Sequence, residues 1–389
     1  MLSKGIWKEL KKTQKLIWGF ITPAVMIAFI SLSFIWTFLF RIGREDLFLQ
    51  AVTFKELLSP LAFFSTVSIL LYMFIFFIQS FIATLILRRH VKNFEKYKED
   101  KSNYLLAFVF SSLISSVMLY SISYFLPGYY GKDHGWVVPA EFVLTATINI
   151  VICFLLNNSL IDRRTLLMTK TEKRFFKLKY HITFPFLLGV ASWCFVFPLG
   201  LLLKFIDFEP GTNMVIQIAS LGILTFLIIL FSLLPGIAFL TMPVSFKVPV
   251  QLIFITLAAI TAIVLSSIIA PVIPVQIINL SMKLSGTTKY DNYYYALPKK
   301  NYPSKMFEYK EWSLRESKND EHYIVEGFSL FSFGTISLIC PVNTSGAIEK
   351  SMKFIVFNSD YDAKLRSELS KATAKCNVII KGDFKSWRA

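Results

Sequence analysis

Residues that could do acid–base or metal chemistry are few in this sequence and widely separated. The four histidines are His90, His134, His181 and His322, and none has a second His or Cys at the spacing of metal ligands. Asp133 and His134, with Glu141 nearby, form the one local group of acid and base. A solvated loop on the outer face accounts for them. The sequence therefore predicts no catalytic residue, no metal site and no cofactor.

An acidic triplet near the C-terminus has a different explanation. Asp360, Tyr361 and Asp362 follow an apolar stretch, and the pattern resembles the Asp-x-Asp metal motif of nucleotide-sugar glycosyltransferases. Such a motif needs a nucleotide-binding α/β domain before it, and the segment is too short to contain one. Ser359 and Asp360 as the N-cap of a helix explain the same residues, so we expect a helix to begin here.

Seven apolar stretches must position any functional side chains. Each is about 20 to 30 residues long without an ionisable side chain, and about 20 apolar residues cross the hydrocarbon core as a helix. The stretches are Leu16 to Phe40, Pro60 to Leu87, Tyr104 to Leu126, Phe142 to Ile161, Ile182 to Leu203, Met214 to Thr241 and Gln251 to Leu280. We expect an α-helical polytopic membrane protein with about seven transmembrane helices and a small C-terminal α+β extramembrane domain.

The chain has a net charge of +16, and its Lys and Arg residues are concentrated in alternate segments between these stretches. Five Lys/Arg precede the first stretch, six follow the second and seven follow the fourth, whereas the segments after the first, third and fifth hold three, one and one. This alternation is the positive-inside pattern, which puts the N-terminus in the cytoplasm. We therefore expect no nucleic-acid partner. The cationic loops also suit anionic lipid headgroups.

Composition divides the chain into four segments. We expect a basic cytoplasmic N-terminus (1–15), a transmembrane domain (16–282), a linker (283–304) and an extracytoplasmic α+β domain (305–389). Tyr290, Tyr293, Tyr294 and Tyr295 suggest an interface anchor that leads into the linker. In the last domain we expect strands at Met306 to Leu314, Tyr323 to Leu330, Phe333 to Cys340, Lys353 to Phe357 and Asn377 to Ile380, and a helix at Asp360 to Ala374.

The segment Arg41 to Ser59 mixes apolar and charged residues. It fits an amphipathic helix on the outer membrane surface. The alternative is a connecting helix that packs on the bundle.

Cysteine usage agrees with an external C-terminal domain. Cys340 and Cys376 are its two cysteines, and an oxidising compartment would let them pair. The alternative is two buried thiols. Cys153 and Cys194 lie in the middle of apolar stretches, where a thiol behaves as a small apolar group.

Polar and small residues within the stretches have two interpretations each. Ser111, Ser112, Ser115 and Ser116 could line a pathway, or could hydrogen-bond between helices. The absence of ionisable groups from the stretches argues against an ion-coupled pump. Ala258, Ala262, Ser266 and Ala270 form a helix-packing face that fits packing inside the bundle or homodimer formation.

These features favour binding over catalysis. We expect a non-enzymatic protein of the cell inner membrane that presents its extracytoplasmic surface to a protein partner. One specific version is an immunity protein against a pore-forming toxin. The alternatives are a permease or channel component for a neutral or lipid-like solute, and a membrane enzyme that uses Asp133, His134 and Glu141.

Overall fold

The computed structural model describes residues 23–88, 98–125, 137–209, 211–242, 248–316, 321–356 and 358–388. The chain forms two compact units. Unit 1 consists of Met1–Tyr72 and Val272–Ala389, and unit 2 consists of Met73–Pro271. Each unit is described by itself below, for the described residues only.

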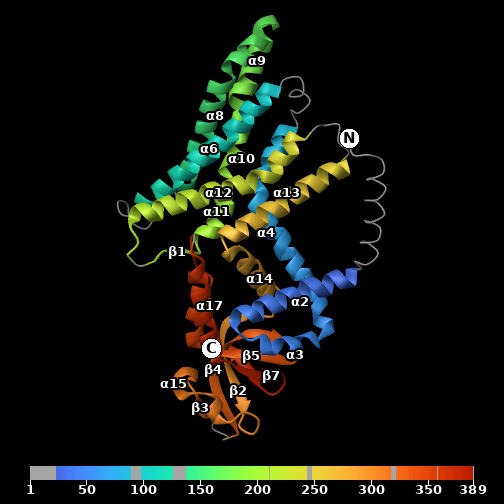
Figure 1. The fold of residues 1–389 in the computed structure, drawn as a ribbon, viewed down its shortest axis with the longest axis vertical. Helices are drawn as coiled ribbons and strands as arrows, with labels where there is room; N and C mark the ends of the chain where they lie inside the picture. Colours follow the sequence, from blue (N-terminus) through green and yellow to red (C-terminus); the bar gives the residue numbers. More distant parts are fainter. Residues whose placement is uncertain are drawn as a thin grey trace. The chain divides into compact units, whose positions relative to one another are not determined.

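The helices of unit 1 come from both ends of the chain (Figure 1). They are α2 (Pro23–Ile42), η1 (Glu45–Leu47), α3 (Phe48–Val52), η2 (Lys55–Leu57), the start of α4 (Leu58–Arg88), α14 (Val272–Leu284), η5 (Ser304–Met306), α15 (Tyr309–Trp312), η6 (Val342–Thr344), α16 (Ser345–Ser351) and α17 (Ser359–Thr373). The predicted helix at 360–374 is confirmed as α17. Its N-cap is Asn358, whose side-chain oxygen accepts a hydrogen bond from the Tyr361 N–H, so the predicted cap at Ser359 and Asp360 is wrong.

Unit 1 contains an antiparallel sheet in the order β7-β5-β4-β2-β8, with β3 also paired to β4. Its strands are β2 (Lys289–Pro298), β3 (Arg315–Glu316), β4 (His322–Phe333), β5 (Ile336–Pro341), β7 (Asn377–Ile380) and β8 (Lys385–Arg388); the short β6 (Phe354–Ile355) lies outside this sheet. The stretch 283–304 differs from the linker that we expected, because its residues Lys289–Pro298 form β2 in the interior of the sheet. The expected strand at 306–314 is also wrong, since η5 and α15 lie there.

Both faces of the sheet are covered, which explains why every residue of β5 is buried. One face packs on Ile35, Phe38 and Leu39 of α2, together with Leu47 and Ala51 of the following segment, in one apolar core. The other face packs on Phe307 and Trp312 in a second core. The segment 41–59 is therefore a connecting segment, and its side chains Ile42, Leu47, Ala51 and Leu58 complete the first core while Leu49 and Leu57 stay exposed.

Unit 2 is a bundle of long helices. They are the rest of α4, α6 (Lys98–Phe125), α8 (Val137–Arg164), η3 (Thr165–Leu167), α9 (Lys170–Leu178), the π-helical turn η4 (Lys179–Thr183), α10 (Phe184–Trp193), α11 (Val196–Leu203), α12 (Met214–Thr241) and α13 (Val248–Ile269), with the short strand β1 (Ile206–Asp207). Helix α8 packs on α6 and α10, and α12 packs on α13. The packing of α8 on α10 is antiparallel, because Asn149 contacts Pro185 while Phe142 contacts Trp193.

Prolines divide two of the expected spans. Helix α10 ends at Trp193 and α11 begins at Val196, so the helix is broken at residues 194 and 195. Pro198, in the first turn of α11, explains the break, because it has no N–H to donate to the Cys194 carbonyl four residues earlier. The expected span from 251 to 280 is not one helix. Helix α13 ends at Ile269, just before Pro271, and α14 belongs to unit 1.

Five helical stretches among the described residues are long and apolar enough to cross a membrane. They are Lys55–Leu87, Pro139–Arg163, Lys170–Leu203, Met214–Thr241 and Pro249–Ile269. The protein is thus a mostly helical, multi-pass membrane protein with a small sheet region.

Candidate functional site

The candidate catalytic residues do not come together. The described residues contain no group of three His, Cys, Asp or Glu side chains that could hold a metal ion. His181 is buried against the ring of Phe154, and His322 begins β4. Asp133 and His134 lie outside the described residues. The acidic triplet at 360–362 forms the first turn of α17, where carboxylates favour the positive end of the helix dipole.

Glu141 does not lie in a solvated loop, so that expectation is wrong. It lies near the start of α8, fully buried, and neither of its carboxylate oxygens has a hydrogen-bond partner. It begins a buried polar stripe with a spacing of four residues: Glu141, Thr145, Asn149, Cys153 and Asn157. A buried carboxyl group is therefore present within the apolar helical stretch Pro139–Arg163.

The serines of α6 are engaged between helices. Ser111 Oγ lies 2.8 Å from Ser192 Oγ of α10, and Ser112 Oγ accepts a hydrogen bond of 2.5 Å from Gln79 Nε2 of α4. The same Gln79 accepts a hydrogen bond of 3.3 Å from Ser232 of α12. These bonds join four helices, which is the helix-packing interpretation of the serines. Ser115 is buried with no hydrogen-bond partner for its hydroxyl.

The small residues of α13 are mostly buried. Ala262, Ser266 and Ala270 are inaccessible, and Ala258 is half-buried. Because α13 packs along α12, small side chains on α13 allow close approach of helices.

Cys340 and Cys376 form a disulfide in unit 1, with Sγ atoms 2.02 Å apart. Cys340 lies near the end of β5 and Cys376 directly precedes β7, so the bond joins the two strands beside their last paired residues. Both cysteines are buried in the first core. Cys153 and Cys194 are buried free thiols in unit 2.

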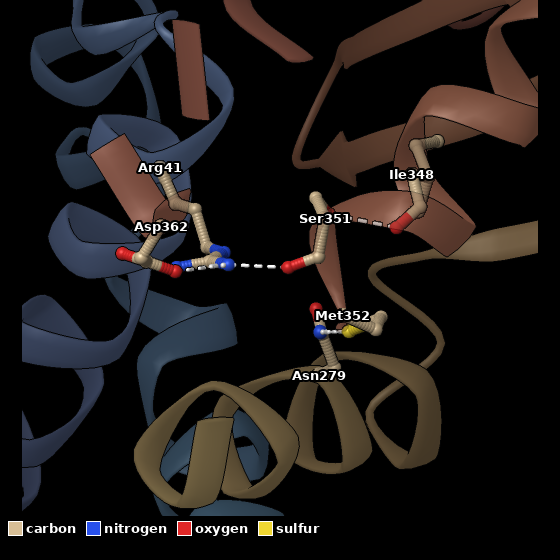
Figure 2. Close-up of polar contacts among 6 residues, drawn as sticks. All are labelled: Arg41, Asn279, Ile348, Ser351, Met352 and Asp362. Atoms are coloured by element: carbon tan, nitrogen blue, oxygen red, sulfur yellow. Dashed lines mark hydrogen bonds and ion pairs between the residues drawn. The ribbon is translucent and has the colours of Figure 1, made fainter. Parts of the chain in front are cut away.

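Polar contacts fasten the C-terminal helices of unit 1 to α2 and α14 (Figure 2). The Arg41 guanidinium donates to the Ser351 carbonyl and lies 3.2 Å from Asp362 Oδ1. On α14, Asn279 Nδ2 lies 2.7 Å from the Met352 sulfur. The Thr373 hydroxyl donates to the Ile42 carbonyl, and Arg44 donates to the Cys376 carbonyl at 3.1 Å. These bonds satisfy the last carbonyl of α2 and fix α17 against it.

A groove of about 770 Å³ lies beside β7 in unit 1. It is lined by Gln50, Thr53, Phe54, Asn301, Tyr302, Thr335, Ile336, Val378, Ile380 and Asp383. The Phe54 ring contacts the hairpin between β4 and β5. A Cβ atom at Gly334 would lie 2.2 Å from Phe54 Cγ, and Gly334 has φ +59°, so both space and backbone require glycine there.

The polar end of the groove is held in a fixed arrangement. The Tyr302 hydroxyl donates to Asp383 Oδ2 at 3.0 Å and accepts from the Ile380 N–H at 3.0 Å. Asn301 Nδ2 lies 3.3 Å from the same carboxylate oxygen. Burial raises the pKa of the Tyr302 phenol above its usual value, and the hydrogen bond to Asp383 acts in the same direction. Tyr302 therefore stays neutral at physiological pH and keeps both bonds.

Strand β7 is an edge of the sheet. The Ile380 N–H points away from β5, toward Tyr302. Because alternate residues of a strand point their backbone groups the same way, the backbone N–H and C=O of Val378 also point away from β5. The exposed side chain of Ile380, at 55%, lies at the same edge. The Ile380 N–H and C=O are already bonded to the Tyr302 hydroxyl and the Asp383 N–H, so Val378 is the residue of β7 that offers outward backbone groups to a ligand. A groove beside these groups is suited to an extended peptide that pairs with the strand at Val378.

The fold and this groove define a class: a helical, multi-pass membrane protein with a disulfide-bonded α+β unit that carries an open groove. Comparisons with protein-family models, with curated proteins and with solved structures find no match for this chain.

The sequence did not single out the groove residues. Gly334 between two apolar runs is a hairpin signal that could have located one wall. Phe54, Tyr302 and Asp383 carry no local signal, because their partners lie in distant parts of the chain.

Proposed function

We propose that this chain is an inner-membrane protein that crosses the bilayer seven times and binds a protein partner, without catalysis, through the groove beside β7 on the extracytoplasmic side. The seven crossings are the five long apolar stretches together with α2 and α6. The apolar parts of these two, Ala28–Ile42 and Ser102–Met118, are the shorter stretches. Helix α14 is not a crossing, since 13 residues are too few to span the hydrocarbon core.

Contacts within unit 1 support the side of the membrane. The end of α2, the segment 43–57 and the start of α4 share one core with the C-terminal domain, so all of them must lie on the same side. Residues 43–57 connect the first two crossings, and the cationic segments 1–15 and 88–101 lie before and after those crossings. The positive-inside rule therefore favours an extracytoplasmic position for all of unit 1. The Cys340–Cys376 disulfide is compatible with an oxidising compartment.

The groove is the single observation that carries the partner proposal. It combines the outward backbone groups of Val378 at the edge of β7, an apolar wall from Phe54 and Ile336, and a polar end at Asp383. Main-chain hydrogen bonds to β7 would supply affinity, and the groove would select side chains of the added strand. An immunity protein against a pore-forming toxin is the specific version that we favour, because it needs only to bind the toxin beside the bilayer.

Site-specific photocrosslinking in cells tests the groove. A photoreactive residue at Gln50, Thr335 or Ile380 should give one shared protein adduct, whereas the exposed α17 positions Lys364 and Glu368 should not. Val378→Pro removes an N–H that faces the partner and leaves the pairing with β5 intact, so it should abolish the adduct. Equal adducts from groove and α17 positions, or an adduct unchanged by Val378→Pro, would refute binding at this edge.

The immunity version has a separate test. Deleting the gene should make cells sensitive to a toxin encoded beside it, and expression of the intact protein should restore resistance. Thr335→Arg, which places a large side chain at the groove rim, should restore it poorly. If deletion leaves sensitivity unchanged, the immunity version is lost while partner binding can still be judged by crosslinking.

Glu141 and Ser115 favour a second candidate, a permease or channel component for a neutral or lipid-like solute. Both side chains are buried in unit 2 without hydrogen-bond partners, and such groups in a membrane bundle often mark a pathway. Solute uptake that is unchanged in Glu141→Leu and Ser115→Leu variants would exclude this candidate.

A further inference from the structure

Helix α9 has an apolar stripe that faces away from its own bundle. Thr171, Phe175 and Leu178 recur at helical spacing and are all exposed, with Phe175 at 71%. The opposite face is packed, since the Phe176 ring lies 4.4 Å from the buried Tyr180 ring. Exposed aromatic and aliphatic groups of this size are unfavourable in water. The stripe therefore needs an apolar environment.

Cationic side chains flank this stripe, and the acidic side chains nearby are not paired with them. Arg174 lies on one side and Lys179 on the other, and Lys170 lies one turn before Arg174; all three are exposed. The nearby acids are engaged elsewhere. The Glu172 carboxylate accepts hydrogen bonds from the Thr169 N–H at 3.1 Å and hydroxyl at 2.7 Å, and Asp162 pairs with Lys177 at 2.6 Å. The three cations thus have no acidic partner among the described residues, and the Lys179 ammonium lies 5.4 Å from the centroid of the Tyr180 ring.

A groove of about 490 Å³ runs beside the stripe. It is lined by Met168, Thr171, Glu172, Phe175, Phe176 and Lys179. Two phenyl rings and a thioether form its apolar part, and Lys179 and the Thr169-bonded Glu172 form its charged part. An acyl chain fits the apolar part, while a phosphate fits beside the ammonium.

The length of the helix places α9 at the membrane surface. The helical stretch Lys170–Leu203 has 34 residues, which at about 1.5 Å each is about 50 Å. The hydrocarbon core is only about 30 Å thick. If residues 183–203 cross the core, α9 lies at the level of the headgroups on the side of the cationic loops. Phe175 then reaches the acyl chains while Arg174 and Lys179 reach phosphates.

We propose that α9 and its groove form a binding site for an anionic phospholipid of the adjacent leaflet. The site depends on membrane insertion of α8 to α11 and is independent of partner binding by unit 1. An acidic soluble protein could also recognise the cations, but it would not account for an apolar groove that is continuous with a membrane-crossing helix.

Lipid binding by the purified full-length protein tests the site. In detergent, defined amounts of phosphatidylglycerol or phosphatidylcholine are added and bound lipids are counted by native mass spectrometry. The wild type should bind phosphatidylglycerol in preference to phosphatidylcholine. Substituting Lys170, Arg174 and Lys179 together by Gln should weaken phosphatidylglycerol binding by about fivefold per cation, or on the order of a hundredfold in all. Phe175→Ser should weaken the binding of both lipids.

A matched control removes the same charge elsewhere. Lys350, Lys364 and Lys371 are exposed on α16 and α17, and their joint substitution by Gln should leave lipid binding unchanged. The proposal fails if the two lipids bind equally to the wild type, or if the α9 triple variant binds phosphatidylglycerol like the control. It also fails if the α9 variant keeps the lipid but loses binding of an acidic polypeptide such as polyglutamate, which would indicate a protein site.

Discussion

At Gly334, a single residue controls how the segment after the first apolar helix packs on the sheet. Its φ of +59° is unfavourable for a residue with a Cβ, and that Cβ would overlap the Phe54 ring. We predict that Gly334→Ala lowers the free energy of unfolding of unit 1. The unfavourable backbone conformation contributes about 1 kcal/mol, and the overpacked contact with Phe54 contributes about 1–3 kcal/mol more. Thermal unfolding of the purified protein, followed by proteolysis within unit 1, measures this loss.

Gly286 provides the matched control. It has a similar φ of +71°, but a Cβ there would meet no atom within 4 Å. Gly286→Ala should therefore show only the backbone penalty. Combining Gly334→Ala with Phe54→Ala should cost less than the two single changes added together, because the clash is relieved. Equal effects of the two glycine substitutions would mean that Phe54 does not contact the hairpin.

At Glu141, the apolar surroundings of the side chain determine how a substitution changes the stability of the protein. A buried carboxylate without a partner is costly to ionise in an apolar bundle, and a neutral amide of the same shape avoids that cost. We predict that Glu141→Gln leaves the melting temperature of the detergent-solubilised protein unchanged or raises it. Asn149→Leu is the contrasting control, since Asn149 donates 2.6 Å to the Pro185 carbonyl and its loss should destabilise. A marked loss of stability in Glu141→Gln would indicate that the carboxylate has a bound partner.

At the scale of elements, the disulfide keeps β7 at the edge of the groove. The bond links residues 36 positions apart, and closing a loop of that length stabilises a fold by about 3–4 kcal/mol in the chain-entropy model. We predict that Cys376→Ser lowers the stability of unit 1 by roughly this amount and exposes β7 to proteolysis. Thermal unfolding with and without a reducing agent measures it. Cys153→Ser serves as the control for reductant sensitivity, which should persist in that variant.

Elements with local signals were predictable from sequence, and those defined by distant partners were not. Strand β7 and helix α17 follow from β-branched residues and from apolar residues at helical spacing. Strand β2 was mistaken for a membrane anchor and linker, because its tyrosines suit either role until its pairing with β4 is known. Pro271 marks the end of α13 in the sequence. The residues on both sides of it are apolar, however, so the sequence does not show that the chain passes from unit 2 to unit 1 at this point.

The candidate site depends on the same non-local packing. The two disulfide cysteines of the neighbouring core could be named from the sequence, since they are the two in the last domain. The groove could not, because Gln50 and Phe54 reach it only when the segment after α2 packs against the β4–β5 hairpin. An amphipathic pattern at 41–59 showed that the segment packs on something, but not on what.

At the scale of the whole molecule, the shared core of unit 1 limits the possible topologies. Residues near position 50 and residues of α17 belong to one compact unit, so no arrangement can put them on opposite sides of a membrane. The side itself belongs to the proposed topology, in which the cationic loops face the cytoplasm. That topology predicts one accessibility for Gln50 and Lys371 and the opposite one for Arg163.

Labelling of single introduced cysteines by a membrane-impermeant maleimide checks this prediction. In a background with Cys153 and Cys194 replaced by Ser, the variants Gln50→Cys and Lys371→Cys should react in intact cells, since both positions are exposed. Arg163→Cys, at an exposed position in the cationic end of α8, should react only after the cells are permeabilised. If Gln50→Cys and Lys371→Cys differ from each other, the two segments do not share a unit. If both are protected while Arg163→Cys reacts in intact cells, the orientation is reversed, and the groove then faces the cytoplasm, where a partner arriving from outside could not reach it.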